Sequence, residues 1–159
     1  MINTVIAPTT ITEAETFIWY QANPRLSLGV AHLYKQNSFR WLASINILPE
    51  SAKFPGINAS AGVQGIGTGN PGYSVTAEKN WTLGEASLNV YSGAGFRSNE
   101  NHAHGLVGLK YTTPDRWTFG FQNEGHQTHP FVTYSWDQYT TGLFLINGKS
   151  PAYMIGVRF

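Results

Sequence analysis

The residues best suited to chemistry in this chain are two pairs of histidines. His102 and His104 share one short stretch of sequence, and His126 and His129 share another. Imidazole nitrogens are common zinc ligands, so four of them on one rim would suit a divalent metal. Neither spacing is a specific metal signature, and the chain has no cysteine to add thiolate ligands. We therefore expect solvated loop residues and neither a metal nor a cofactor, with zinc binding by these histidines as the alternative.

A glycine-rich segment at residues 65–69 has the composition of a phosphate-binding loop. Such loops need a helix N-terminus behind them, and neither a helical pattern nor a GKS-type lysine follows here. We interpret the segment as a strand end that runs into a turn. No Ser-His-Asp set accompanies His32, which shares a face with Leu28 and Val30. The sequence therefore predicts no enzymatic activity and no catalytic residues.

Charge and composition narrow the class of protein. The chain carries 10 Lys and Arg against 9 Asp and Glu, so no excess of charge attracts nucleic acid. Charged residues make up 12% of the chain, against roughly 25% in an ordinary soluble domain. Aromatic residues reach 14% and glycines number 17, which does not suit a disordered chain. This composition favours a sheet that exposes much of its surface to something other than water.

Strands must position these residues, because apolar and polar side chains alternate along most of the chain. From residue 39 to residue 47, one face carries Phe39, Trp41, Ala43, Ile45 and Ile47. The same alternation recurs over residues 57–66, 86–96, 117–124 and 153–159. It leaves open the faces of residues 12–21 and 129–136, where the pattern is weak.

The sequence holds about eleven strand-like segments of roughly nine to eleven residues, the length that a tilted membrane strand needs. The segment 3–9 adds a twelfth if Pro8 sits at a strand end or in a bulge. No apolar run approaches the roughly 20 residues of a membrane helix. Single-chain bacterial barrels have an even number of strands. We predict that residues 1–159 form one all-β domain, a closed antiparallel up-and-down transmembrane β-barrel of about 12 strands, with ten as the alternative.

The polar face of these strands carries Gly, Ser, Thr, Asn and Gln with scattered charges, which suits a narrow lumen. Charges enclosed in a barrel need partners, so we predict a lumen salt-bridge network. Its members would be Arg40, Glu78, Lys110, Glu124 and Arg158. A soluble barrel that binds an apolar ligand is the alternative, and it would turn the aromatic face inward instead.

Loop order separates the strand ends into an outer and a periplasmic set, and aromatic residues fall near both ends. Amphipathic rings favour the headgroup level of a bilayer, so we predict two aromatic girdles. The outer girdle is Tyr34, Trp41, Tyr73 and Phe96, and the periplasmic girdle is Trp81, Tyr111, Trp117 and Trp136. Lys79 points to lipid by parity, and we expect it to snorkel toward the headgroups beside Trp81.

The last strand ends on alternating apolar residues: Tyr153, Ile155, Val157 and Phe159. This pattern resembles the C-terminal assembly signal of outer-membrane β-barrels, which implies recognition by the barrel-assembly machinery. Three further stretches are similar to the barrel repeats of YjbH-type proteins. They are NPRLSLGV (23–30), ILPES (47–51) and GVQGIGTGN followed by YSVTAEK (62–79). The resemblance covers roughly the first half of the chain and implies polysaccharide-export components as partners.

The first residues, MINTVIAPTT, lack a basic region followed by an apolar run, so no signal peptide is recognisable. We therefore expect this to be the mature form of an outer-membrane protein whose main partner is the lipid bilayer. We predict a small pore or a structural or export-associated component without enzymatic activity. The alternatives are the soluble ligand-binding barrel and an outer-membrane enzyme, for which the sequence offers little support.

Overall fold

The computed structural model describes residues 1–7, 13–63 and 70–159. Within these ranges the regular structure is entirely β, and twelve strands close into one antiparallel barrel. The predicted all-β barrel of about 12 strands is therefore confirmed. In the described part of the chain, no helix is long and apolar enough to span a membrane. Pro8 and the glycine-rich segment 65–69 lie outside the described residues.

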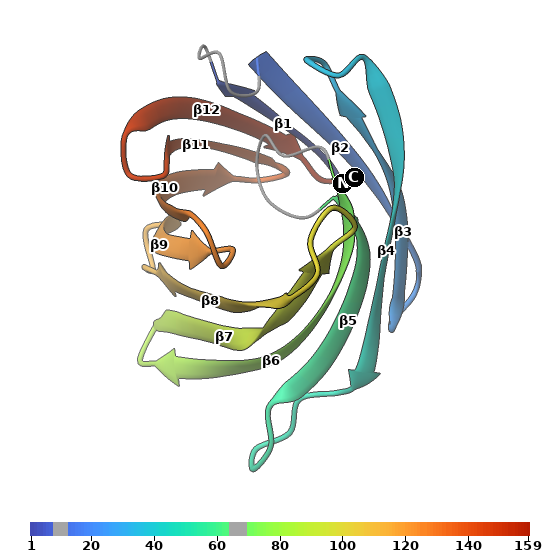
Figure 1. The fold of residues 1–159 in the computed structure, drawn as a ribbon. Coiled ribbons are helices and arrows are strands. Elements are labelled where there is room, and N and C mark those ends of the chain that lie inside the picture. Colours follow the sequence, from blue (N-terminus) through green and yellow to red (C-terminus); the bar gives the residue numbers. More distant parts are fainter. Residues whose placement is uncertain (8–12, 64–69) are drawn as a thin grey trace.

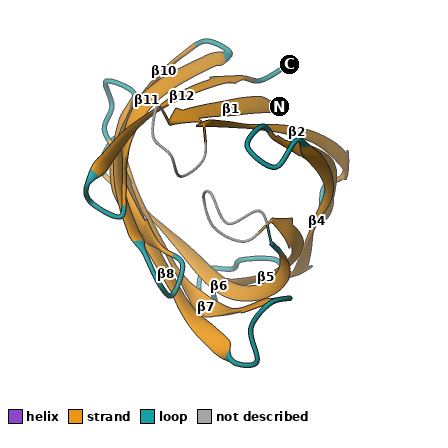
Figure 2. Ribbon diagram, turned by 45° about the horizontal axis from the view of Figure 1, so that its top comes forward, coloured by secondary structure: helices purple, strands orange, loops and turns teal. Residues whose placement is uncertain are grey.

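The strands are β1 (Ile2–Ala7), β2 (Glu13–Asn23), β3 (Leu26–Leu33), β4 (Ser38–Leu48), β5 (Gly56–Val63), β6 (Pro71–Leu83), β7 (Ala86–Arg97), β8 (Ala103–Thr112), β9 (Trp117–Asn123), β10 (Thr128–Trp136), β11 (Tyr139–Ile146) and β12 (Ser150–Val157). Each strand pairs with its neighbours in the sequence, and β1 closes the barrel against β12 (Figures 1 and 2). The closing ladder runs from Ile2 opposite Val157 to Ile6 opposite Tyr153. The two chain ends therefore lie close together (Figure 1).

Tight turns join several strands at one end of the barrel. Leu83 pairs with Ala86 and Trp136 pairs with Tyr139, so each turn contains two residues. Gly84 and Asp137 hold the first position with φ of 66° and 47°, a conformation that Gly, Asn and Asp adopt readily. Because successive antiparallel strands alternate in direction, the connections at residues 23–25, 49–55 and 113–116 share this end. These five connections share one end of the barrel, as the order of the loops predicts.

Side chains alternate between the outside and the inside of the barrel along each strand. In β4, Trp41 is 60% exposed while its neighbour Leu42 is 4% exposed. Strand register carries this division around the barrel, because Trp41 lies opposite Val30 and Leu42 lies opposite Gly29. The aromatic and aliphatic face predicted for residues 39–47 is therefore the outer face.

The interior has two different sides. The first, which we call the apolar wall, is formed by β10–β12 and β1–β4 and carries two clusters of buried hydrophobic side chains. One cluster contains Val5, Phe144, Ile146 and Ala152, and the other contains Ala31, Leu33 and Leu42. The second side, the polar wall, is formed by β5–β9 and carries amide, hydroxyl and charged groups. The prediction of a polar lumen is correct for the polar wall, whereas the apolar wall combines large inward hydrophobic residues with buried polar ones such as Glu15 and Thr133.

Candidate functional site

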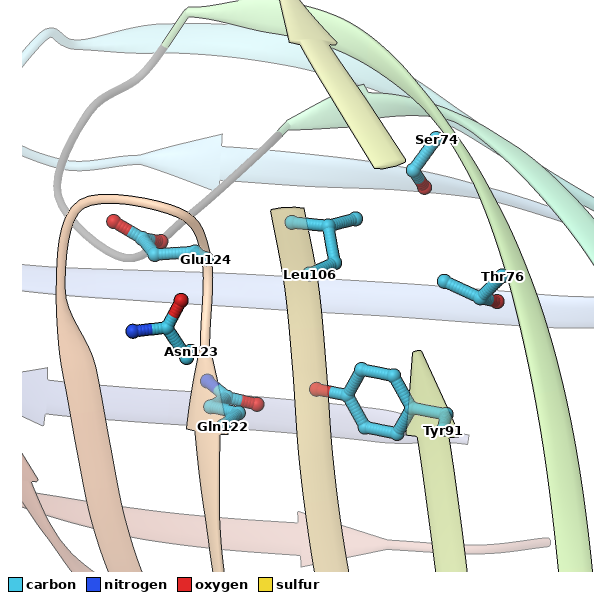
Figure 3. A pocket seen from close by; sticks show the side chains of 7 residues that line it. All are labelled: Ser74, Thr76, Tyr91, Leu106, Gln122, Asn123 and Glu124. Atoms are coloured by element: carbon cyan, nitrogen blue, oxygen red, sulfur yellow. The ribbon is translucent and has the colours of Figure 1, made fainter. Parts of the chain in front are cut away.

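A small cavity lies against the polar wall (Figure 3). Its volume is about 210 Å³, and its lining comes from β6 to β9 and the residue that follows β9. The lining residues are Ser74, Thr76, Tyr91, Leu106, Gln122, Asn123 and Glu124. Hydroxyls, amides and one carboxylate thus surround a single aromatic ring. Such a lining is able to hydrogen-bond a small polar solute.

Tyr91 lies across the neighbouring strand because that strand has a glycine beneath the ring. Gly108 is directly opposite Tyr91 in the β7–β8 register. A Cβ at position 108 would lie 2.3 to 2.5 Å from the atoms Cε1, Cζ and Oη of Tyr91. Any larger residue would therefore displace the ring and reshape the cavity.

An ionic cluster lies at the loop end of this cavity, and Glu124 belongs to both. We call it the rim cluster, and its members are Arg97, Glu100, His104, Glu124, His126 and His129. At its centre Arg97, 8% exposed, places Nη2 at 3.1 Å from Glu124 Oε1 and Nη1 at 3.6 Å from Glu100 Oε1. One guanidinium therefore joins the β7–β8 loop to the residue after β9.

Two imidazoles contact Glu100, the second carboxylate that faces Arg97. His104 Nε2 contacts Glu100 Oε2, and His126 Nε2 lies 3.2 Å from Glu100 Oε1. Burial acts to raise the pKa of Glu100, but the hydrogen bond with His104 and the charges of His104, Arg97 and His126 lower this pKa below its usual value. The carboxylate form of Glu100 is thus favoured by its surroundings.

His129 is completely buried at the edge of the cluster. Its Nδ1 accepts a hydrogen bond from the backbone N–H of Asn147 at 3.2 Å. The neutral ring therefore carries its proton on Nε2. That atom has no hydrogen-bond partner within the described residues, and Glu124 Oε2 lies 3.8 Å away. The cluster thus retains an unused buried donor.

The expectation that the histidines are solvated is wrong for two of them. His104 and His129 face inward on β8 and β10, and they are 7% and 0% exposed. His102 and His126 lie in loops and are exposed. Glu100, His104 and His126 each offer a ligand atom, and these atoms all lie within 4.8 Å of one another. Within residues 1–7, 13–63 and 70–159, these three residues are therefore the ones placed to hold a metal ion.

The five charges predicted to form a lumen network are spread over the barrel instead. Arg40 faces inward opposite Ala31 and donates from Nη1 to the Phe39 carbonyl. Lys110 lies opposite Asn89 and is exposed, and Arg158 is exposed beyond the end of β12. Their inward positions were correctly derived from alternation for β4 and β8. The strand register places these three residues on different parts of the barrel.

Glu78 and Glu124 do have partners, but these partners are residues outside the predicted set. Glu124 pairs with Arg97, which the sequence reasoning did not single out. Glu78 accepts hydrogen bonds from Asn58 Nδ2 at 3.2 Å and Asn89 Nδ2 at 2.6 Å. A half-buried carboxylate thus has amides as its hydrogen-bond donors.

These amides extend into a ladder of side-chain hydrogen bonds that runs from β4 across the neighbouring strands of the polar wall. Asn46 donates to Asn58 at 2.8 Å, and Asn89 donates to Asn80 Oδ1 at 2.8 Å. Both pairs are directly opposite in the register of neighbouring strands. The sequence reasoning missed this ladder, although asparagines on the predicted inner face of adjacent strands were the available signal.

The ladder ends at Glu50, in the long connection between β4 and β5. Glu50 accepts from Asn80 Nδ2 at 2.6 Å and from the Asn80 backbone N–H at 3.0 Å. It also lies 3.2 Å from Lys79 Nζ, whose ammonium donates to the carbonyls of Ser51 and Ala52. Hydrogen bonds from the Asn80 side chain and backbone are the main reason that the pKa of Glu50 is lowered. Lys79 is thus neutralised by this loop, a partner that the snorkelling prediction did not include.

The predicted girdle residues all lie on the outer face. Each of these side chains is between 38% and 64% exposed: Tyr34, Trp41, Tyr73, Phe96, Trp81, Tyr111, Trp117 and Trp136. At the end opposite the rim cluster, Trp117 contacts Tyr134 with ring centroids 5.0 Å apart, and Trp136 contacts Tyr139 at 5.8 Å. Of the residues in the predicted assembly signal, Tyr153, Ile155 and Phe159 are exposed and Val157 is half-buried.

His32 lies on the outer face of β3, away from the rim cluster. Its ring stacks on Phe39 at 4.5 Å on the outer face, and it also contacts Tyr34. The rim cluster and the cavity beside it are therefore the candidate site. No protein-family model matches the chain, and no curated protein matches it in sequence.

Proposed function

We propose that the protein is an integral β-barrel of a bacterial outer membrane, a structural or export-associated component or a narrow pore without enzymatic activity. The observation that carries this proposal is the character of the outer face. Phe39, Trp41, Tyr73, Tyr153 and Ile155 are each more than half exposed. Contiguous apolar surface of this kind is rare on soluble monomers and is what lipid contact requires.

The contrast between outside and inside supports the same proposal. The buried polar residues include Glu15, Arg97 and His129, whereas the exposed residues include most of the tryptophans. A protein in water is expected to have the reverse arrangement. On the outer face, Lys79 has Glu50 as its counter-ion, which lowers the cost of placing an ammonium near hydrocarbon.

The apolar wall favours a structural role over a water-filled channel. The lumens of conducting barrels are polar, whereas Phe144, Ile146 and Leu33 face the interior here. We therefore expect no conductance steps in a planar-bilayer recording. Well-resolved steps that persist in purified protein would instead favour the pore version and leave the membrane assignment intact.

Three partners follow from the proposal. The first is the lipid bilayer itself, around the outer face. The second is the barrel-assembly machinery, suggested by the outward row of Tyr153, Ile155 and Val157. The third, from the resemblance of the first half of the chain to YjbH-type barrels, is the set of components that export polysaccharide.

A soluble barrel that binds an apolar ligand is the second candidate, and the two apolar clusters inside the barrel favour it. The two candidates differ in which tryptophans meet hydrocarbon. Trp41 faces outward and is 60% exposed, whereas Trp19 packs against the inner cluster around Leu33. Two single-tryptophan proteins, one retaining Trp41 and one retaining Trp19, separate these faces.

The test is refolding from urea with vesicles that contain brominated phospholipids, which quench tryptophan by contact. The membrane proposal expects strong quenching of Trp41, weak quenching of Trp19 and a heat-modifiable band on gels. The same protein refolded without lipid or detergent should not give that band. A β-folded, monodisperse protein in plain buffer, with neither tryptophan quenched by added vesicles, would overturn the proposal in favour of the soluble barrel.

A further inference from the structure

We infer that Glu100, His104 and His126 form a binding site for one divalent transition-metal ion, of the zinc type, at the loop end of the barrel. The ligand atoms come from the β7–β8 loop, from β8 and from the β9–β10 loop, and they lie within 4.8 Å of one another. A tetrahedral ion with bonds of 2.0–2.1 Å holds its ligand atoms about 3.4 Å apart. His126 Nε2 and Glu100 Oε1 are separated by 3.2 Å, which already fits that spacing.

The ligand types select the class of ion. Two imidazoles and one carboxylate suit zinc, nickel or copper, whereas calcium and magnesium prefer oxygen ligands throughout. Three protein ligands leave a fourth position for water or for one more imidazole. His102 is the candidate for that position, because its ring centroid lies 4.6 Å from that of His104.

The surrounding charges also favour a cation. Glu100 and Glu124 bring two carboxylates, and Arg97 brings one guanidinium, so the group lacks one positive charge when the imidazoles are neutral. Arg97 is 8% exposed and is anchored by Glu124. It therefore fixes the orientation of the Glu100 carboxylate from outside the ligand set, as residues around metal ligands commonly do.

The buried ring of His129 borders this group. Its Nε2 is buried and has no hydrogen-bond partner in the described part of the chain. Glu124 Oε2, the acceptor it faces, is 3.8 Å away. This N–H is a donor, so His129 lies outside the ligand set, and its natural acceptors are the Glu124 carboxylate or a water molecule.

Binding would tie two loops together across the mouth of the polar cavity. Glu100 belongs to the β7–β8 loop and His126 to the β9–β10 loop, and the cavity-lining residue Glu124 begins the second loop. An ion held by both loops would fix their separation. The ion would therefore hold the entrance of the cavity in one shape.

The experiment uses the full chain without a polyhistidine tag, refolded in detergent, checked for a heat-modifiable band and freed of metal with a chelator. Cobalt(II) is the probe, because its visible absorption strengthens in tetrahedral sites, and zinc competition gives the affinity. We expect one equivalent of cobalt to bind and to be displaced by zinc. His126→Ala should weaken binding at least tenfold, and this variant should still fold because His126 is 43% exposed.

His32→Ala is the matched control, since it removes an imidazole from the outer face of β3 and should leave binding unchanged. Glu100→Gln removes the carboxylate ligand at constant shape and should weaken binding as His126→Ala does. Failure of the folded protein to bind cobalt or zinc below millimolar concentration would overturn the inference. So would equal affinity in the parent protein and His126→Ala. Neither result bears on the membrane proposal, because metal binding is measured on protein that is already folded in detergent. The membrane proposal is tested separately, by tryptophan quenching in lipid vesicles.

Discussion

The two interior walls of this barrel stabilise their inward side chains by different interactions. Along the polar wall, hydrogen bonds and ion pairs join amides, carboxylates and Arg97. Along the apolar wall, side chains such as Phe144 and Ile146 pack without polar partners. In a packed hydrophobic cluster, the loss of unfolding free energy grows with the volume that a substitution removes. In a buried ionic group, removing a single partner is strongly destabilising, because it leaves an uncompensated charge.

The apolar wall also includes the closure of the barrel. β1 has six residues and pairs with β12 at five positions, whereas β6 and β7 pair at twelve. Fewer backbone hydrogen bonds therefore hold β1 than hold the long hairpin of the polar wall. The inward side chain Val5 compensates by packing against Phe144, Ile146 and Ala152 across three strands. A buried hydrophobic cluster thus supports the short ladder that closes the barrel.

The largest effect should come from placing an amide in each wall. Leu33 and Leu106 both face inward, but Leu33 is completely buried in the apolar wall and Leu106 is half-buried on the polar wall. We expect Leu33→Asn to lower the free energy of unfolding by about 4 kcal/mol or more, and Leu106→Asn by about 1 kcal/mol or less. Urea titration in detergent measures both. Equal losses would remove the distinction between the walls.

Removing the central cation of the rim cluster should have the next largest effect. Arg97→Ala leaves the carboxylates of Glu100 and Glu124 without their guanidinium, at a cost of about 3 kcal/mol. Arg116→Ala is the control, because its pair with Asp137 is 3.9 Å long and its side chain is 60% exposed. We expect about 0.5 kcal/mol or less for that variant. Similar urea midpoints for the two variants would show that the rim cluster contributes no more than a surface pair.

Breaking the amide ladder should cost less, because neutral hydrogen bonds are weaker. Asn58→Ala removes the bonds to Asn46 and Glu78. We expect a loss of about 1–2 kcal/mol in the free energy of unfolding. Gln138→Ala, in an exposed turn, should leave the urea midpoint within error of the parent. A neutral result for Asn58→Ala would mean that water replaces the ladder without penalty.

The smallest effect should be a loss of stability in acid that originates in the polar wall and its loops. The pKa values of Glu50 and Glu100 are lowered from 4.5 on folding. At a pH between the folded and the unfolded pKa of each carboxyl, the unfolded chain therefore binds more protons than the folded chain. Their contribution is full above pH 4.5 and is lost as the pH falls through the folded pKa. The urea midpoint should therefore decline below that pH, and less steeply in a Glu50→Gln, Glu100→Gln variant. An identical decline in that variant would place the acid sensitivity elsewhere.

Alternation predicted the barrel, its strand number and its outer face wherever one side of a strand is polar. It gave no answer for residues 12–21, and β2 shows why. Phe17 and Trp19 face the interior cluster, whereas Ile18 and Tyr20 are exposed on the outer face. Where both environments are apolar, both faces carry hydrophobic residues and the period of two disappears. Hydrophobic pattern alone therefore leaves the apolar wall undetected.

The rim cluster was only half predicted, for a different reason. The sequence places His104 and His126 in or beside neighbouring loops, but it does not show that Glu100 lies between them. Arg97 and Glu124 are far apart in the chain, and their contact depends on strand register and on how each loop turns. Such pairings become visible only when the backbone is placed in space.

The carboxylate of Glu50 also bears on the behaviour of the chain toward other copies of itself. β6 continues to Leu83, while its partner β5 begins at Gly56, opposite Glu78. Part of β6 therefore lacks a neighbouring strand on that side, and its free backbone donors form a template to which another chain could add. Glu50 occupies one of these donors, the N–H of Asn80, with a charged group that no strand can extend. By covering this part of β6, the loop should hinder edge-to-edge aggregation of unassembled chains.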